Sequence, residues 1–193
     1  MKILALSGSS REASFNRRLL DIAVAGARQA GAEVTVVDLS EYELPLYDQD
    51  LEYSEGVPEA AAELKKLMVE HHGLLIASPE YNGFPTPLLK NTFDWLSRKQ
   101  TEHEPPMFAF QHKIAAVVAA SPGAGGGTRG LTILRIYLQN LGIMVLPGQV
   151  TLGQAGQAFR EDGRLHNDQI QKATESLGAE LFEVLQKQSD RLD

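Results

Sequence analysis

Residues 3–16, ILALSGSSREASFN, decide the fold of this chain. The apolar residues 3–6 predict a buried β-strand, the small polar residues after them predict a loop, and a helix is expected to begin at Ser14. The first backbone N–H groups of a helix have no intrahelical acceptor, and the helix dipole favours an anion beside them. A strand, a polar loop and a helix in this order therefore indicate a site for a phosphate group.

Side chains of the same loop also favour an anion. Arg11 supplies a positive charge with a fork of donors, and its neighbours supply hydroxyl and amide groups. The alternative to an anion site is a loop whose side chains only cap the following helix. The loop lacks the P-loop motif and the Gly-x-Gly-x-x-Gly motif, which disfavours nucleotide hydrolysis and NAD binding at this loop. The candidate binding residues are Ser9, Arg11, Ser14, Phe15 and Asn16.

Strands and helices alternate along the rest of the chain. Residues 74–77 and 114–120 are apolar throughout, as in parallel strands that helices cover on both faces. We predict an α/β fold: one three-layer α/β/α domain over residues 1–193, with a five-stranded parallel sheet of order 2-1-3-4-5. The expected strands are 2–7, 33–38, 74–77, 114–120 and 143–146, and the expected helices are 14–30, 58–72, 87–98, 129–141 and 167–187.

Composition restricts the class of protein. A length of 193 residues suits one domain, and a net charge of −7 argues against a general nucleic-acid binder. Cysteine is absent, which excludes disulfides and a cysteine nucleophile and fits a cytoplasmic protein. No apolar stretch is long enough to predict a membrane span. Residues 40–57 are a candidate functional loop, 99–112 a surface loop and 188–193 a frayed end.

In the predicted sheet order, the loops after the first, third and fourth strands line one crevice. The second of these loops, residues 78–87, combines turn-forming residues with aromatic ones, so its rigid backbone can face the edge of a flat ring, with Tyr81 against the ring. A structural turn is the alternative, and Glu80 has the alternative of a solvated or helix-associated carboxylate. The candidate residues of this loop are Pro79, Glu80, Tyr81, Asn82 and Gly83.

The third loop, residues 121–128, is rich in glycine. Glycine allows a backbone to approach a ligand closely or to adopt unusual conformations. Ser121, Gly123 and Gly125 are therefore candidate ligand contacts, and the alternative is a flexible turn in which Thr128 caps the following helix.

Three blocks of the sequence together resemble the NADPH-dependent FMN reductase family, which comprises flavodoxin-like quinone, azo-dye and chromate reductases. The blocks are GSSRxxSxN at residues 8–16, SPEYNG at 78–83 and LKNxxDWLSR at 89–98. The resemblance extends from the first strand through the fifth. One departure is FPTP at residues 84–87, where many relatives have Ser-Ile-Pro-Gly or Ser-Ile-Thr-Pro. Phe84 is bulkier and Pro85 is stiffer than the residues at these positions in those relatives.

The resemblance implies a flavodoxin-like fold, non-covalently bound FMN, and NADPH or NADH as electron donor. It further implies homodimers or homotetramers with the active site near a subunit interface. Ser9, Arg11, Ser14 and Asn16 would bind the FMN phosphate, residues 79–83 would surround the isoalloxazine ring, and the loop from Ser121 would lie near it. The expected activity is a two-electron reduction of quinones, free flavin or similar acceptors.

The flavin itself performs the chemistry in such enzymes, so we assign no catalytic side chain. Two alternatives stay open: a flavodoxin-type electron carrier, and a flavin-binding regulatory protein without turnover. We also predict no metal site, because Asp48 and Asp50 lack a third ligand and the histidines have no metal-ligand spacing. The five histidines are interpreted as exposed residues of helix ends and loops, at positions 71, 72, 103, 112 and 166.

The helix expected over residues 87–98 carries charged residues at helical spacing. Asp94 is spaced for ion pairs with both Lys90 and Arg98. Trp95 faces either the core or a subunit interface. Residues 44–50 resemble a segment near the subunit boundary of the family, and an ordinary surface loop is the alternative.

Overall fold

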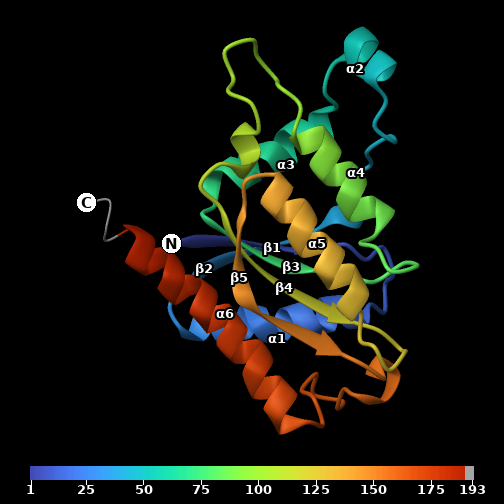
Figure 1. Ribbon diagram of the computed structural model, residues 1–193, viewed down its shortest axis with the longest axis vertical. Coiled ribbons are helices and arrows are strands. Elements are labelled where there is room, and N and C mark those ends of the chain that lie inside the picture. The colour runs from blue at the N-terminus through green and yellow to red at the C-terminus, as the bar shows by residue number, and fades with distance from the viewer. Residues whose placement is uncertain (190–193) are drawn as a thin grey trace.

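The computed structural model describes residues 1–189 and contains a parallel sheet of five strands (Figure 1). The strand order is β2-β1-β3-β4-β5, as predicted. All neighbouring strands pair in parallel, so their carboxyl ends lie at one edge of the sheet. The strands are β1 (Lys2–Ser7), β2 (Glu33–Asp38), β3 (Gly73–Ala77), β4 (Ile114–Ala120) and β5 (Met144–Leu152).

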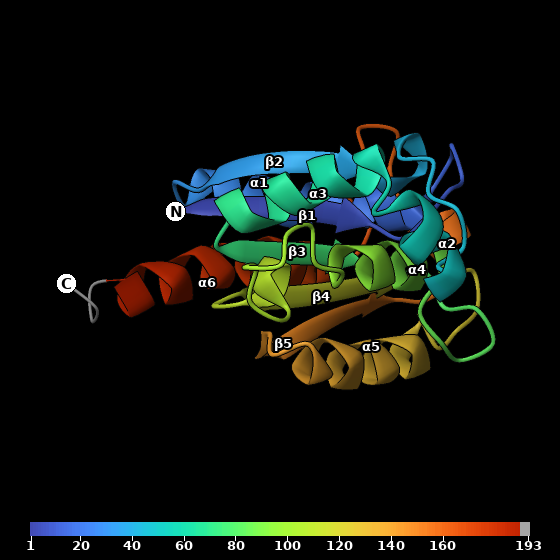
Figure 2. The ribbon, with the colours of Figure 1, turned by 90° about the horizontal axis from the view of Figure 1, so that it is seen from above.

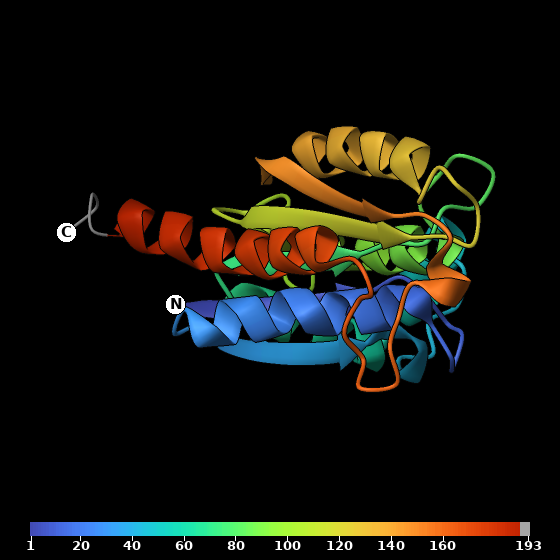
Figure 3. The same cartoon turned by 90° about the horizontal axis from the view of Figure 1, so that it is seen from below.

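Helices cover both faces of the sheet. Two of them, α1 (Phe15–Gln29) and α6 (Asp168–Ser189), lie side by side on one face (Figure 3). On the other face lie α3 (Glu59–Glu70), α4 (Pro87–Leu96) and α5 (Thr128–Asn140) (Figure 2). Three short 3₁₀ turns and a short helix, α2 (Gln49–Glu55), complete the elements of residues 1–189.

The core divides along the sheet because successive side chains of a strand point to opposite faces. In β1, Ile3 and Ala5 pack under α1 and α6, whereas Leu4 and Leu6 pack under α3, α4 and α5. Each of these four side chains is at most 1% exposed. Burial on both faces explains why the strands are apolar throughout.

The α1–α6 contact depends on two glycines. A Cβ atom added at Gly26 of α1 would lie 1.9 Å from the carbonyl oxygen of Glu175, and one added at Gly178 of α6 would lie 1.9 Å from that of Ala23. Both neighbours are backbone atoms of the opposite helix, so a side chain at either position has no room. The two helices therefore approach as closely as they do because each presents a glycine to the other.

Three elements differ from the sequence predictions. The segment 99–112 is not wholly a surface loop, because its 3₁₀ turn Phe108–Phe110 buries Ala109 and Phe110 in the core. Within the loop expected over residues 40–57, Asp48 starts α2 by accepting hydrogen bonds from the N–H groups of Asp50 and Leu51 at 2.7 and 3.3 Å. No residue of α2 is buried, so it has no apolar periodicity to detect. Strand β5 extends beyond the predicted end at residue 146, because Pro147 and Gly148 lie in a register shift of an edge strand and do not end it.

The predictions for the chain end and the histidines need correction. Gln188 and Ser189 belong to α6 and are not frayed, while residues 190–193 lie outside the described residues. His71 is 3% exposed, because its ring bonds the Leu67 carbonyl at 2.7 Å and the Thr35 hydroxyl at 2.8 Å. The other four histidines are exposed as predicted. No helix in residues 1–189 is both long and apolar enough to cross a membrane.

Candidate functional site

The loops after β1, β3 and β4 meet at a cavity of about 110 Å³ beside the N-terminus of α1. Nine of the thirteen candidate residues line it, and Ala120 and Pro122 complete the wall. The other four candidates, Asn82, Gly83, Gly123 and Gly125, belong to the same loops but are not part of the wall. The nine are Ser9, Arg11, Ser14, Phe15, Asn16, Pro79, Glu80, Tyr81 and Ser121.

The α1 side of the cavity presents donors. Ser14 is the N-cap of α1 and accepts a hydrogen bond from the Arg17 N–H at 3.3 Å, and the Ser9 hydroxyl accepts one from the Arg11 N–H at 3.4 Å. Both hydroxyl groups are nearly buried, and each keeps its own proton for a further acceptor. The guanidinium of Arg11 is exposed and lies 5.7 Å from the centre of the Phe15 ring. This wall suits a phosphate group.

Asn16 fixes the wall to the sheet. Its side-chain amide donates to the carbonyl of Ala120 at 2.8 Å and accepts from the N–H of Ala120 at 2.9 Å. Asn16 is 4% exposed, so both hydrogen bonds are buried. One N–H of the side-chain amide and its oxygen are therefore engaged by the end of β4, while the second amide N–H and the backbone N–H of Asn16 remain available to a ligand.

Residues 81–84 form a tight hairpin at the opposite wall. The N–H of Tyr81 donates to the Phe84 carbonyl at 2.9 Å, and the N–H of Phe84 donates to the Tyr81 carbonyl at 3.1 Å. Asn82 and Gly83 between them have φ angles of 54° and 85°, which Asn-Gly pairs favour in two-residue hairpins. Tyr81 and Phe84 are 47% and 59% exposed. The turn thus presents two aromatic side chains that the chain itself does not bury.

The glycines of the third loop fall into two groups. Gly126 and Gly127 have positive φ angles, and an added Cβ would lie 2.9 Å from the Gly153 nitrogen or 2.7 Å from the Ala119 Cβ, so both are needed to fold the loop. At Gly125, no described atom lies within 4 Å of an added Cβ. Gly125 therefore borders open space, whereas an added Cβ at Gly123 would lie 3.7 Å from the Ser121 hydroxyl oxygen. The N-cap of α5 is Gly127, so the alternative of a Thr128 cap is wrong.

Residues 1–157 match the family described as NADPH-dependent FMN reductase. The chain belongs to this family. The predicted family is confirmed, and so is the enzyme class, an NAD(P)H-dependent flavin oxidoreductase with FMN and NAD(P)H as cofactors.

Individual relatives agree with the family. An NAD(P)H-dependent FMN reductase of Pseudomonas aeruginosa is 35% identical over 173 residues, which cover 89% of this chain and 88% of the relative. A quinone reductase of Escherichia coli is 33% identical over 150 residues, which cover 76% of this chain and 73% of the relative. The flavoenzyme NAD(P)H:acceptor oxidoreductase FerB of Paracoccus denitrificans has a TM-score of 0.77 at 23% identity, covering 96% of this chain and 97% of FerB, which confirms the flavodoxin-like fold.

The wall of the cavity suits the phosphate end of FMN. It combines an arginine, two nearly buried hydroxyl groups and the free N–H groups at the start of a 15-residue helix. The volume of the cavity is below the ~300–1,000 Å³ of typical ligand pockets, so the cavity has room for the phosphate end of FMN and not for the whole cofactor. Among residues 1–189, no group of three or more histidine, aspartate or glutamate side chains is arranged to hold a metal ion.

Glu80 joins the aromatic hairpin to α5, which corresponds to the helix-associated alternative for its side chain. One carboxylate oxygen accepts the N–H of Gly130 at 2.9 Å, and the other accepts two guanidinium bonds from Arg129 at 3.0 and 3.2 Å. The Gly130 N–H lowers the pKa of the carboxyl group; burial opposes this, and Arg129 adds to the lowering. Sequence reasoning missed these partners, because no local pattern links positions so far apart in the chain.

We expect Glu80→Gln to lower the free energy of unfolding by about 1 kcal/mol at neutral pH, since it removes the charge at the α5 terminus. Because the folded pKa lies below the unfolded one, this stabilisation is present above the unfolded pKa near 4.5 and disappears as the pH falls through the folded pKa. Urea unfolding of both proteins between pH 7 and 3 measures the difference. Arg129→Gln is the control, with a smaller effect because Arg129 is 82% exposed. A difference that does not depend on pH would contradict this role of the charge.

Thr86 joins the first two loops and was not among the candidates. Its hydroxyl donates to the carbonyl of Gly8 at 2.6 Å and accepts the N–H of Leu89 at the start of α4. A Cβ atom added at Gly8 would lie 2.8 Å from this hydroxyl oxygen, so the glycine makes room for it. The signal was present in the sequence, because threonine before a proline is a typical helix start.

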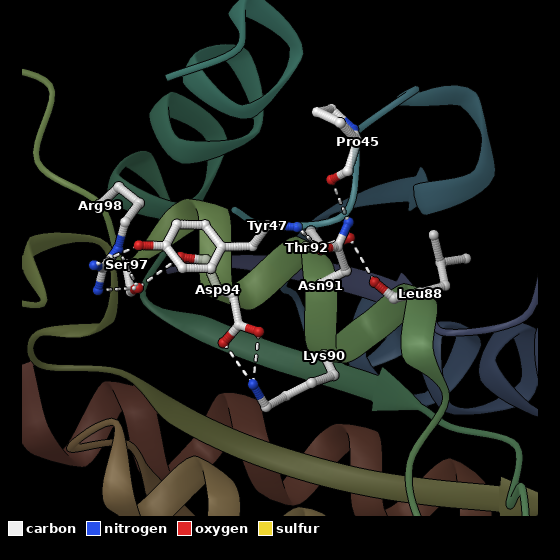
Figure 4. A network of polar contacts seen from close by, with 9 residues as sticks. All are labelled: Pro45, Tyr47, Leu88, Lys90, Asn91, Thr92, Asp94, Ser97 and Arg98. Atoms are coloured by element: carbon white, nitrogen blue, oxygen red, sulfur yellow. Dashed lines mark hydrogen bonds and ion pairs between the residues drawn. The ribbon is translucent and has the colours of Figure 1, made fainter. Parts of the chain in front are cut away.

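The helix that follows the hairpin, α4, holds residues 45–47 through polar contacts (Figure 4). Asn91 accepts the N–H of Tyr47 at 2.8 Å and donates to the carbonyl of Pro45 at 2.9 Å. Trp95 is fully buried and donates to the same carbonyl at 2.8 Å, so its core alternative is confirmed and its interface alternative is wrong. The segment is thereby held against the same helix as the hairpin.

One of the two expected ion pairs of α4 is confirmed. Lys90 pairs with Asp94 at 2.6 Å. Arg98 does not pair with Asp94; it donates instead to the hydroxyl of Tyr47 at 3.2 Å and lies over the Tyr47 ring (Figure 4). The reason is that Tyr47 lies within reach of the C-terminal end of α4, which helical spacing alone does not reveal.

Proposed function

We propose that this protein uses FMN and NAD(P)H to reduce quinones, free flavin or similar acceptors by two electrons, as one domain over residues 1–193. The observation that carries this is the junction of the three loops at the α1 terminus, with cationic and hydroxyl donors on one wall and an aromatic hairpin on the other. Relatives named FMN reductase and quinone reductase support the choice of acceptors.

FMN, when bound, would supply the two-electron redox chemistry between NAD(P)H and the acceptor. The chain's own residues would bind the cofactor and orient it. Ser9, Arg11, Ser14 and the first N–H groups of α1 would hold the phosphate, and the backbone of residues 79–83 would face the ring edge. The Glu80 contact with α5 and the Thr86 contact with Gly8 keep these loops at a fixed separation.

The direct test is a titration of the purified protein with FMN, followed by anaerobic reduction with NADPH or NADH. We expect quenching of flavin fluorescence on binding, and then complete bleaching of the bound flavin by either donor, with reoxidation by a quinone. No quenching would exclude the cofactor. Bound flavin that NAD(P)H does not reduce would favour the regulatory protein. Two resolved one-electron steps in a parallel titration with dithionite would favour the electron carrier.

Arg11→Ala is expected to weaken FMN binding about tenfold, because a charge-assisted hydrogen bond to the phosphate contributes about 1.5–3 kcal/mol and Arg11 is partly screened by solvent. Riboflavin, which lacks the phosphate, should lose less than twofold. Fluorescence titrations with both ligands measure the effect. Arg11→Lys keeps the charge but loses the fork of donors, so its FMN affinity should lie between those of the unaltered protein and Arg11→Ala. Equal losses for FMN and riboflavin would show that Arg11 does not contact the phosphate.

We further propose a homo-oligomer whose subunit interface lies near the site. The cavity encloses only part of the cofactor, and Leu46, Tyr53 and Phe84 are 79%, 77% and 59% exposed, which is the kind of apolar surface that interfaces cover. Light scattering on the FMN-loaded protein distinguishes a dimer, a tetramer and a monomer, and a monomer would contradict the proposal. The cysteine-free sequence favours a cytoplasmic location, which cell fractionation tests.

A further inference from the structure

A hairpin outside the region of the family match lies against the phosphate wall. Residues 158–166 are closed by hydrogen bonds from the His166 N–H to the Ala158 carbonyl at 2.9 Å and from the Arg160 N–H to the Arg164 carbonyl at 2.7 Å. Leu165 is fully buried and its N–H donates to the Gln171 side chain of α6 at 2.9 Å. The hairpin is therefore a fixed element, and the family match ends before it, at residue 157.

The hairpin contributes one ring to a stack of four side chains. The rings of Phe159 and Phe15 are nearly parallel, at 10°, with centroids 6.3 Å apart. The Arg18 guanidinium lies 4.1 Å from the centre of the Phe159 ring, and Arg11 lies 5.7 Å from that of Phe15. Arg18 also donates to the Arg160 carbonyl at 3.3 Å. The order through the stack is thus Arg11, Phe15, Phe159, Arg18.

Arg11 and Arg18 have different surroundings. Arg11 lines the phosphate cavity, and among residues 1–189 the Phe15 ring is the group that its guanidinium contacts. Arg18 instead borders a separate cavity of about 360 Å³ whose wall includes Asp21, Asp162 and Glu175. Those carboxylates disfavour an anion there. Arg18 therefore acts within the protein, by holding Phe159, while Arg11 remains available to a ligand.

We infer that Phe159 is a positioning residue for the phosphate site: it fixes the Phe15 ring, and through that ring the guanidinium of Arg11. A cation over an exposed aromatic ring gains about 0.5–1 kcal/mol, so complete loss of the Arg11–Phe15 contact would weaken the ligand about two- to fivefold. A change at Phe159 acts on that contact only through the Phe15 ring, so its effect lies at the lower end of this range. This inference rests on the proposed FMN site. It assigns a binding role to a segment outside the family match.

The test replaces Phe159 by leucine, which stays apolar but removes the aromatic face. We expect FMN affinity to fall about two- to threefold and riboflavin affinity to change less than 1.5-fold. Phe159→Tyr should restore the FMN affinity, because it restores the ring. Phe108→Leu is the matched control, since Phe108 is a partly exposed phenylalanine away from the cavity, and it should change neither affinity.

A second arm tests the path through Arg11. In an Arg11→Ala background, Phe159→Leu should cause no further loss of FMN affinity, because the group that it positions is gone. If Phe159→Leu lowers the thermal midpoint of the apo-protein by more than ~5 °C, Arg18→Gln replaces it; this variant leaves both rings in place and should lower FMN affinity about twofold, again without affecting riboflavin.

Equal losses for FMN and riboflavin, or a full further loss in the Arg11→Ala background, would overturn the inference. So would an unchanged ratio of the two affinities in both Phe159→Leu and Arg18→Gln. The proposed function fails separately, if the unaltered protein binds no FMN or does not prefer FMN to riboflavin.

Discussion

Replacing Asn16 by alanine is expected to lower the free energy of unfolding of the apo-protein by about 2–4 kcal/mol. The reason is that the N–H and the carbonyl of Ala120 both lose a buried partner, at about 1–3 kcal/mol for each unsatisfied group. For a chain of this length the thermal midpoint should fall by about 5–15 °C. Thermal unfolding followed by circular dichroism, without FMN, measures the effect.

Asn91→Ala is the matched control. Asn91 makes the same pair of bonds, one accepted and one donated, to the backbone of residues 45–47, but it is only half-buried, so water can replace the lost partner. Its loss should stay near 1 kcal/mol. An apo-protein midpoint that Asn16→Ala leaves unchanged, combined with lost FMN binding, would mean that Asn16 serves the ligand and not the attachment of α1 to β4.

Gly178→Ala is expected to lower the free energy of unfolding by about 3 kcal/mol or more, which is a large effect for the addition of one methyl group. The new Cβ would lie 1.9 Å from the Ala23 carbonyl oxygen, and since that atom is backbone, α6 has to move away from α1. Overpacking of this kind outweighs the ~1 kcal/mol by which alanine favours a helix over glycine. Urea unfolding measures the loss, and FMN binding should weaken as well because α1 carries the phosphate wall.

Two further variants make this prediction specific. Ser176→Ala changes an exposed position of the same helix and should change the free energy of unfolding by less than about 0.5 kcal/mol. Gly26→Ala has the reciprocal clash with Glu175, so the double variant should lose less than the sum of the two single losses, because helices already separated accommodate the second methyl group. A Gly178→Ala protein as stable as the original would show that the helices separate without cost.

The sheet order and the meeting of three loops were predictable because their signals are local. An apolar strand, a polar turn and a helix start occupy consecutive residues at each of the three positions, and the rule that parallel strands end at one edge brings the loops together. The Asn82–Gly83 turn was predictable for the same reason, since the dipeptide itself favours positive φ at both residues.

The partners of the site residues were not predictable, because each belongs to another part of the chain. Glu80 meets Gly130, Asn16 meets Ala120 and Phe15 meets Phe159, and no local pattern indicates any of these pairs. These contacts changed the roles assigned to individual residues, whereas the position at which the three loops meet stayed as predicted. Glu80 and Asn16 use side-chain groups to hold segments of the chain together.

The hairpin at residues 81–84 has a practical consequence for protein engineering. Its shape depends on two backbone hydrogen bonds and on the φ angles of Asn82 and Gly83, while the side chain of Phe84 is 59% exposed. Position 84 can thus take other side chains without disturbing the turn, and under the proposed function such substitutions would alter which acceptors reach the flavin. A directed-evolution campaign aimed at bulky dyes or quinones would begin at this residue and leave its neighbours on the turn unchanged.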